Sequence, residues 1–155
     1  MKAKLVTVLE EAGIAYESLS HAHTESATAE AEALHVSPGE VAKTLIVTTP
    51  IGHVRAVILA SARVDMHKLR EVLHVPGKQL RLATEEELAR DYPEFDLGAV
   101  PPFGGSRDEP VVIDTRLMER ETVVLEAGSH DESVRIATED LRKLTHARVA
   151  EISQD

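Results

Sequence analysis

Residues 44–61 read TLIVTTPIGHVRAVILAS, two apolar, β-rich runs on either side of the turn residues Pro50-Ile51-Gly52. Val, Ile and Thr are branched at Cβ and fit best on the pleated surface of a strand. Two such runs joined by a short Pro/Gly segment predict a β-hairpin. We therefore expect a fold that contains a β-sheet with this hairpin in it.

The rest of the chain changes irregularly between helical and extended patterns. Leu5, Val8 and Leu9 recur with helical spacing, and Thr84 with Glu87 forms a capping box that opens another helix. By the same reasoning we expect helices at residues 2–12, 26–34, 65–73, 84–92 and 138–144, and strands at residues 14–19, 79–83, 111–114, 122–126, 134–136 and 148–152.

Several short strands with interspersed helices predict an α+β fold, a strongly bent mixed β-sheet with helices packed around it. The strict strand–helix alternation of a doubly wound sheet is absent. The phosphate-binding patterns GxGxxG and GxxxxGK are absent as well, which disfavours a nucleotide-driven enzyme. No repeat or linker divides the 155 residues, so we expect residues 1–155 to form a single domain.

Composition excludes several classes of site. The chain has no Cys, which excludes disulfides, thiolate nucleophiles and zinc sites that use sulfur. The apolar run at residues 5–9 is too short for a signal peptide, and no run approaches the roughly 20 residues that cross a bilayer. We expect a soluble, cytoplasmic protein without a membrane partner.

The net charge of −10 is unevenly distributed. Residues 1–84 hold nine Lys/Arg and nine Asp/Glu, whereas residues 85–155 hold eight Lys/Arg and eighteen Asp/Glu. Phosphates repel an acidic surface, so long contact with a duplex and a DNA partner are not expected. The neutral half could still meet the end of a tRNA, or its charges could be ordinary solvated surface; its basic residues include Lys43, Arg55, Arg63, Lys68, Arg70, Lys78 and Arg81.

Lys43 is the first candidate for chemistry, because it stands where a helical turn meets an apolar strand. A lysine there can reach past the sheet edge into water, which is the ordinary structural explanation. Alternatively, a cation held by a rigid strand at the mouth of a pocket can bind a phosphate or polarise a carbonyl.

The second candidate is the segment GAVPPFGG at residues 98–105. Its two prolines fix φ and remove two donors, while its glycines allow backbone to approach a ligand. The remaining N–H groups could converge on a developing oxyanion, or the segment could be a stiff turn with Phe103 in the core. The third candidate is Gly128-Ser129-His130, which is either a plain hairpin turn or a source of hydrogen bonds to substrate or water.

Metal and triad chemistry have little support. The eight His residues show no HExxH or comparable spacing, so no metal site is expected. Ser106, His130 and Asp114 could be combined into a triad, but the nucleophile pattern GxSxG is missing.

Three segments in this order resemble the YbaK/prolyl-tRNA-synthetase-associated editing family. Residues 42–47 (AKTLIV) resemble its lysine strand, and residues 127–130 (AGSH) resemble the glycine turn near its C-terminus. Residues 98–104 (GAVPPFG) resemble its GxxxP loop, with Gly98 and Pro102 at the defining positions. The resemblance covers nearly the whole chain.

The resemblance implies a bent, barrel-like mixed sheet flanked by helices. It also implies hydrolysis of the aminoacyl ester on the 3′ end of tRNA, mostly tRNA(Pro) misloaded with Ala or Cys, with water as nucleophile and no metal or organic cofactor. Lys43 would anchor the terminal adenosine–aminoacyl unit, and Gly98 would supply backbone contacts to the ester. The expected substrate-binding residues are Val100, Pro101, Pro102, Phe103, Gly104, Gly128, Ser129, His130 and His21.

We thus expect a trans-acting aminoacyl-tRNA deacylase, with mischarged tRNA as substrate and prolyl-tRNA synthetase as a further candidate partner. An aminoacyl ester is already labile, so positioning and a few donors can suffice for its hydrolysis. Two alternatives stay open: a non-catalytic module that binds tRNA ends or a synthetase, and a hydrolase of small esters or amides unrelated to tRNA.

Overall fold

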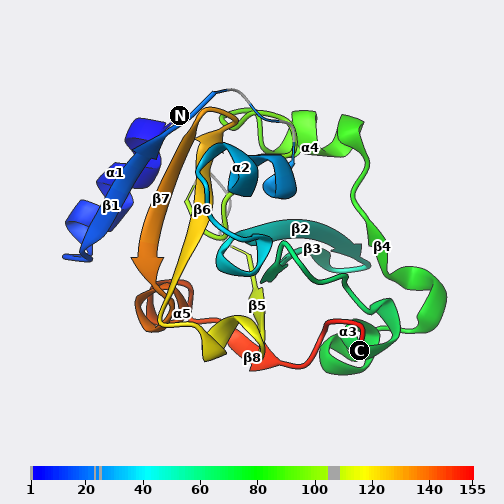
Figure 1. The fold of residues 1–155 in the computed structure, drawn as a ribbon. Coiled ribbons are helices and arrows are strands. Elements are labelled where there is room, and N and C mark those ends of the chain that lie inside the picture. Colours follow the sequence, from blue (N-terminus) through cyan, green and yellow to red (C-terminus); the bar gives the residue numbers. More distant parts are fainter. Residues whose placement is uncertain (1, 23, 25, 105–108) are drawn as a thin grey trace.

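The computed structural model describes residues 2–22, 24, 26–104 and 109–155. The described strands form two sheets, one of five strands and one of three (Figure 1).

The five-stranded sheet contains the hairpin that the sequence predicts. In that hairpin β2 (Ala42–Thr49) pairs antiparallel with β3 (Gly52–Leu59). The short β4 (Arg81–Leu82) lies antiparallel on the other side of β2. Beyond β3 follow β5 (Val111–Asp114) and β8 (Arg148–Ala150), both parallel to their neighbours, which makes the sheet mixed.

The three-stranded sheet is antiparallel, in the order β1-β7-β6. It consists of β1 (Tyr16–Ser20), β7 (Glu132–Ala137) and β6 (Thr122–Ser129). A parallel bridge between Val41 and Val124 joins the start of β2 to β6 and thereby connects the two sheets.

Side chains from both sheets meet in one hydrophobic core. Val57 and Ile113 of the larger sheet pack in the same cluster as Leu125 and Ile136 of the smaller one. Two helices complete this core: α1 (Lys2–Glu11) contributes Leu5 and Leu9, and α5 (Thr138–Thr145) contributes Leu141.

The opposite face of the larger sheet is covered by α3 (Met66–Leu73), whose Leu69 packs with Ile58 and Val112. Successive strand residues point to opposite faces, so Ile58 lies in this second core while Val57 lies in the first. The carboxylate of Asp65 caps α3 by accepting hydrogen bonds from the backbone N–H groups of His67 and Lys68.

The remaining helices lie near the junction of the sheets and at the β4 edge. Ala31 of α2 (Ala27–Ala33) packs on Val41 and Val124, so α2 covers the bridge. Leu88 of α4 (Glu85–Asp91) packs on a small cluster that contains Ile46. The short 3-10 helices are Pro38–Glu40, Gly77–Gln79 and Leu117–Glu119.

The predicted α+β class and the mixed sheet are confirmed, but the barrel-like closure is wrong. The described strands form two separate sheets, and β2 and β6 are connected through the bridge between Val41, just before β2, and Val124. The strand expected at residues 79–83 shrinks to Arg81–Leu82, and the one expected at residues 122–126 extends to Ser129.

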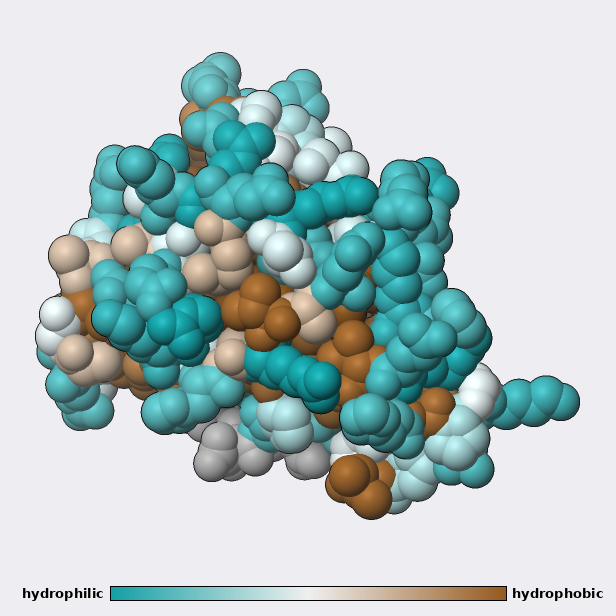
Figure 2. Space-filling model, turned by 90° about the horizontal axis from the view of Figure 1, so that it is seen from below, coloured by the Kyte–Doolittle hydropathy of each residue, from teal (hydrophilic) through white to brown (hydrophobic). Residues whose placement is uncertain are grey.

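The face shown in Figure 2 is mostly hydrophilic, with apolar side chains grouped near its centre. The large apolar side chains exposed on the described part of the chain are Ile51, Leu82, Leu97 and Val149. These four come from different elements, which is usual for a protein surface. Within the described residues, no helix combines the length and apolar content of a membrane span.

Candidate active site

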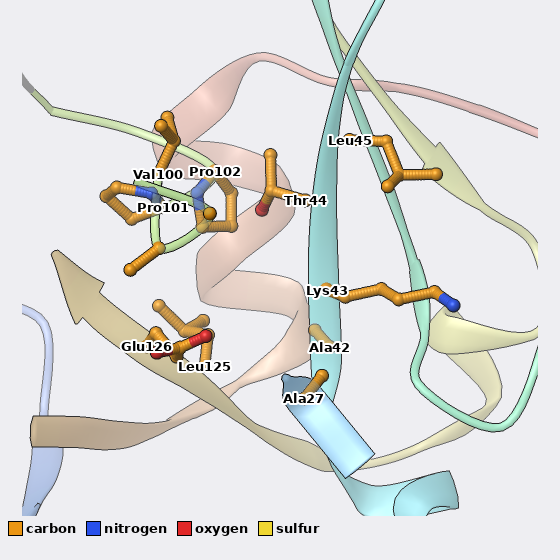
Figure 3. Close-up of a pocket in the computed structure, with 12 residues that line it drawn as sticks. Ala27, Ala42, Lys43, Thr44, Leu45, Val100, Pro101, Pro102, Leu125 and Glu126 are labelled. Atoms are coloured by element: carbon orange, nitrogen blue, oxygen red, sulfur yellow. The ribbon is translucent and has the colours of Figure 1, made fainter. Parts of the chain in front are cut away.

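A pocket opens where β2 and β6 separate after their bridge. It encloses about 530 Å³ of empty space, its open mouth included. In Figure 3, residues 100–102 lie on one side, β2 lies on the other, and Ala27 lies at the bottom. The lining residues are Ala27, Ala42, Lys43, Thr44, Leu45, Gly98, Ala99, Val100, Pro101, Pro102, Leu125 and Glu126.

The β2 wall of the pocket is an open strand edge. The carbonyl oxygen of Val41 accepts from the N–H of Ala60, just after β3, whereas the carbonyl oxygen of Ile46 accepts from Ala83 N–H on the other side. Because these directions alternate along an antiparallel pair, Thr44 also directs its backbone N–H and C=O away from β3. Strand β4 pairs with β2 only at Val47 and Thr48, so it leaves the edge at Thr44 open.

The opposite wall is the Gly–Pro loop, residues 98–104. Gly98 has φ +83°, a left-handed conformation that glycine adopts at little cost. Ala99 N–H donates to the carbonyl oxygen of Asp96, and the two prolines have no N–H. Within the described residues, the N–H groups of Gly98 and Val100 have no acceptor, so the loop retains two donors for a ligand.

Arg55 holds this loop from the side of the sheet. Its guanidinium is 2% exposed and donates to the carbonyl oxygens of Pro101 and Gly104, both at 2.9 Å. The same guanidinium pairs with Glu109 at 3.1 Å and lies over the Tyr92 ring, 5.5 Å from its centroid. A charged donor with five N–H groups in a fixed plane can hold several acceptors at once, so Arg55 fixes the turn of the loop.

Lys43 lines the pocket, but its ammonium group points away from the loop. Figure 3 shows its side chain leaving β2 on the side of Leu45, while Thr44 points toward Pro102. Partial burial and the nearby charge of Arg63 lower the pKa of Lys43. An anionic ligand at this position would therefore be stabilised by two neighbouring cations.

Glu126 provides an acidic group on the loop side of the pocket (Figure 3). Its carboxylate is 11% exposed and lies 3.0 Å from Nδ1 of His130. The ring of His130 is itself buried, with Nε2 2.6 Å from the carbonyl oxygen of Leu97. Because a carbonyl only accepts, Nε2 donates to Leu97, and Nδ1 is the ring atom that faces Glu126.

His130 thus supports the pocket from behind without lining it. A Cβ at Gly98 would lie 3.7 Å from Cε1 of His130, so the ring packs against the backbone of the loop. The backbone N–H of His130 also donates to Asp96, which fixes the start of the same segment. His130 therefore connects Gly98 to Glu126.

The structure brings together five of the expected site residues: Lys43, Gly98, Val100, Pro101 and Pro102. The others lie elsewhere. Phe103 belongs to the main core, and both Phe103 and Gly104 line a separate cavity beside Arg55. The carbonyl oxygen of Gly128 accepts from Asp96 N–H, and the Ser129 hydroxyl donates to Asp131.

His21 lies in a second buried network outside the pocket lining. Its Nε2 is 2.9 Å from the hydroxyl of Ser133, which donates to the carboxylate of Glu30 on α2. Burial raises the pKa of Glu30 to about 7, although the Ser133 hydrogen bond opposes this shift. The network ties α2, and with it the pocket residue Ala27, to β7.

The triad alternative does not assemble. Asp114 accepts hydrogen bonds from the backbone N–H groups of Arg116, Ile152 and Ser153, whereas His130 contacts Glu126, Leu97 and Asp96. Ser106 lies outside the described residues. Among the residues that are described, no three His, Asp or Glu side chains are arranged to hold a metal ion.

The expected basic surface is smaller than the sequence indicates. Arg55 is buried in the loop contact, so its assignment to the surface is wrong. Lys68 pairs with Glu151 and Asp155, and Arg81 pairs with Glu87. Of these cations, Lys43 lines the pocket, and Arg63 is close enough to lower the pKa of Lys43.

The sequence alone did not identify Ala27, Thr44, Leu125 and Glu126 as pocket residues. Glu126 carried a signal, since it is the single acid within the otherwise apolar run 123–127. Thr44 follows Lys43 directly on the same strand. Ala27 and Leu125 carry no such signal, because they reach the pocket only when segments distant in the sequence pack together in the fold.

Comparison with known proteins identifies the family of this fold and pocket. The model of the aminoacyl-tRNA editing domain matches residues 21–144. The chain belongs to this family. The match contains β2, the Gly–Pro loop and β6, which form the pocket walls.

Relatives of this editing domain include two curated bacterial proteins. The uncharacterized protein YwhH of Bacillus subtilis (strain 168) is 28% identical over 129 residues, which cover 81% of this chain and 80% of YwhH. EbsC of Enterococcus faecalis (strain ATCC 700802 / V583), whose name proposes a Cys-tRNA(Pro)/Cys-tRNA(Cys) deacylase, is 24% identical over 156 residues, 98% and 93% of the two chains.

Solved structures share the whole fold. A structure named as a proposed trans-editing enzyme for prolyl-tRNA synthetase has a TM-score of 0.88 and 25% identity, and the match covers 99% of this chain and 97% of that one. The hypothetical protein APE2540 also has a TM-score of 0.88, with 26% identity and coverage of 97% and 99%.

Proposed function

We propose that this editing domain is a trans-acting deacylase, which hydrolyses the ester between a wrong amino acid and the 3′ end of tRNA. The observation that carries the proposal is the pocket between the open edge of β2 and the Gly–Pro loop. One wall offers the N–H groups of Gly98 and Val100, and the other offers the backbone of Thr44. Such a site suits an ester whose carbonyl oxygen gains negative charge during attack by water.

The chemistry requires little from ionisable side chains. In the hydrolysis, water adds to the ester carbonyl, and the ribose oxygen leaves with a proton. Loop N–H groups at hydrogen-bond distance from the carbonyl oxygen would stabilise the tetrahedral intermediate. The resemblance to the editing family implies that a ribose hydroxyl of the substrate activates the water, so the protein needs no nucleophile of its own.

Lys43 fits a role in holding the nucleotide end of the substrate. Its stem forms part of the pocket, while its ammonium group points away from the loop, toward the side of Arg63. A phosphate of the tRNA 3′ end would find a cation there and would raise the lowered pKa of Lys43 again. The ester would then lie between Lys43 and the Gly–Pro loop.

The substrate we propose is tRNA(Pro) charged with alanine or cysteine. The name of EbsC and that of the trans-editing structure support this class. Ala27, Pro101 and Pro102 line the pocket and would contact the acyl group of the substrate. A second sieve for small amino acids is useful, since one methylene gives a synthetase only about 1–3 kcal/mol of discrimination.

A panel of charged tRNAs tests the proposal. The protein should release amino acid from alanyl- or cysteinyl-tRNA(Pro) and leave prolyl-tRNA(Pro) intact. A non-catalytic module would bind these tRNAs without turnover. A small-ester hydrolase would act on model esters without competition from uncharged tRNA, and either result would refute the deacylase assignment.

We propose further that residues 1–155 act as one domain in the cytoplasm, where charged tRNA is found. The shared core of the two sheets and the match over residues 21–144 support the single domain. Prolyl-tRNA synthetase is a candidate partner, supported by the name of the similar trans-editing structure.

A further inference from the structure

The pocket is electrically polarised by its two ionisable lining side chains, Lys43 and Glu126. Figure 3 shows Glu126 on the loop side, below Pro101, whereas the Lys43 ammonium points away on the other side of β2. A ligand between the loop and β6 therefore meets a carboxylate, while the Lys43 ammonium lies beyond the edge of β2.

An aminoacyl ester matches this polarity. It carries a positive ammonium group one carbon from the ester and a negative phosphate several atoms away. With its phosphate near Lys43 and its carbonyl at the Gly–Pro loop, the ammonium would lie toward Glu126. We propose that Glu126 binds the α-ammonium group and so restricts the site to esters of amino acids with a free amino group.

This inference rests on the proposed function and adds to it a determinant of substrate class. Glu126 is suited to the role because its position is fixed. Nδ1 of His130 lies 3.0 Å from its Oε2, and His130 is held in turn by the carbonyl oxygen of Leu97. Since the side chain of Glu126 is only 11% exposed, it attracts a substrate ammonium more strongly than a carboxylate at the surface would.

The His130 contact does not prevent this binding. A positive charge on the His130 ring, which is 5% exposed, would leave the negative charge on the carboxylate of Glu126. A substrate ammonium in contact with Glu126 is closer to the negative charge than to the positive one, so the net interaction is attractive. A carboxylate has room for about four hydrogen bonds, which allows it to serve both groups.

The inference can be tested by binding, independently of turnover. One probe is 3′-deoxy-3′-(alanylamino)adenosine, in which an amide replaces the labile ester. The second probe is its lactyl counterpart, in which a hydroxyl replaces the ammonium with little change in shape. Dissociation constants of both are measured for the wild type, for Glu126→Gln, and for the exposed control Glu121→Gln.

The wild type and Glu121→Gln should bind the alanyl probe at least about tenfold more tightly than the lactyl probe, as expected for one charge-assisted contact. Glu126→Gln should reduce this preference to about twofold or less by weakening only the alanyl probe. Glu126→Asp, which keeps the charge, should retain part of the preference even if Glu126→Gln folds poorly.

Equal binding of the two probes by the wild type, binding of neither, or an equal loss of both in Glu126→Gln would overturn the inference. Failure of the deacylase proposal gives a different result, since it appears as absent release from every charged tRNA. A preference for the alanyl probe that depends on Glu126 would support the inference even if no charged tRNA is hydrolysed.

Discussion

Nη1 of Arg55 lies 2.9 Å from the carbonyl oxygen of Pro101 and links the central hairpin to the Gly–Pro loop that lines the pocket. Because a second N–H group of the same side chain binds Gly104, the loop is fixed at both sides of its turn. The shape of the pocket therefore depends on a buried charge that does not line it.

Replacing Arg55 should damage both the fold and the loop. In Arg55→Met the carboxylate of Glu109 would stay buried without this cation, which costs about 3–5 kcal/mol of unfolding free energy. Urea denaturation measures this loss. The exposed Arg63→Met should change the unfolding free energy by less than about 0.5 kcal/mol, and a similar small change in Arg55→Met would contradict the role of Arg55.

Gly98→Ala should impair deacylation mainly through the backbone. A Cβ there meets His130 at an ordinary contact distance of 3.7 Å, but φ +83° is strained for alanine by about 1–2 kcal/mol. The loop would relax and move its N–H donors. We expect a fall in the rate of release of at least about tenfold.

Gly13→Ala is the matched control for this change. Gly13 has φ +69° and open space around its Cβ position, so alanine there imposes a comparable strain outside the pocket lining. Both variants should lose similar stability, while only Gly98→Ala loses activity. Equal rates of release in the two variants would show that the conformation of Gly98 does not matter for the reaction.

Glu30 should make stability depend on pH. Its pKa is raised from 4.5 to about 7 in the folded protein, so the folded state binds this proton more tightly than the unfolded chain. The unfolding free energy should therefore fall as pH rises from about 4.5 to about 7, by up to ~3 kcal/mol from this group.

Chemical denaturation at pH 5 and pH 8 isolates this contribution. The side chain of Glu30→Gln cannot titrate. This variant should therefore be more stable than the wild type at pH 8 and about as stable as the wild type at pH 5. Glu11→Gln, at the exposed end of α1, should follow the wild type at both values. Parallel behaviour of Glu30→Gln and the wild type would contradict the raised pKa.

The local elements could be predicted from the sequence because their signals are local. The hairpin of β2 and β3, the cap at Asp65 and the capping box at Thr84 all depend on residues within a few positions of each other. The division into two sheets could not, since β1 pairs with β7 more than one hundred residues later. For the same reason the sequence does not predict the bridge between Val41 and Val124, which are also distant in the chain.

The candidate site was predictable in part. Lys43 and the Gly–Pro loop could be identified from their motifs, but the direction of the Lys43 side chain depends on which side of β2 meets the loop. Arg55 looked like a surface cation, although it lies between Val54 and Ala56 in a run that is buried on both faces of the sheet. Glu126 cannot be predicted as a pocket residue from the sequence, because the predicted strand ends there, whereas β6 continues to Ser129.

The central claim is that the pocket between Lys43 and the Gly–Pro loop hydrolyses aminoacyl-tRNA. Initial rates of amino-acid release from alanyl- and cysteinyl-tRNA(Pro) by the wild type, Lys43→Ala and Lys68→Ala test it most directly. Lys68 is paired with acids on α3's side of the sheet and serves as the matched lysine control. The account predicts release by the wild type and Lys68→Ala and loss of most release in Lys43→Ala; release by Lys43→Ala at the wild-type rate would contradict it.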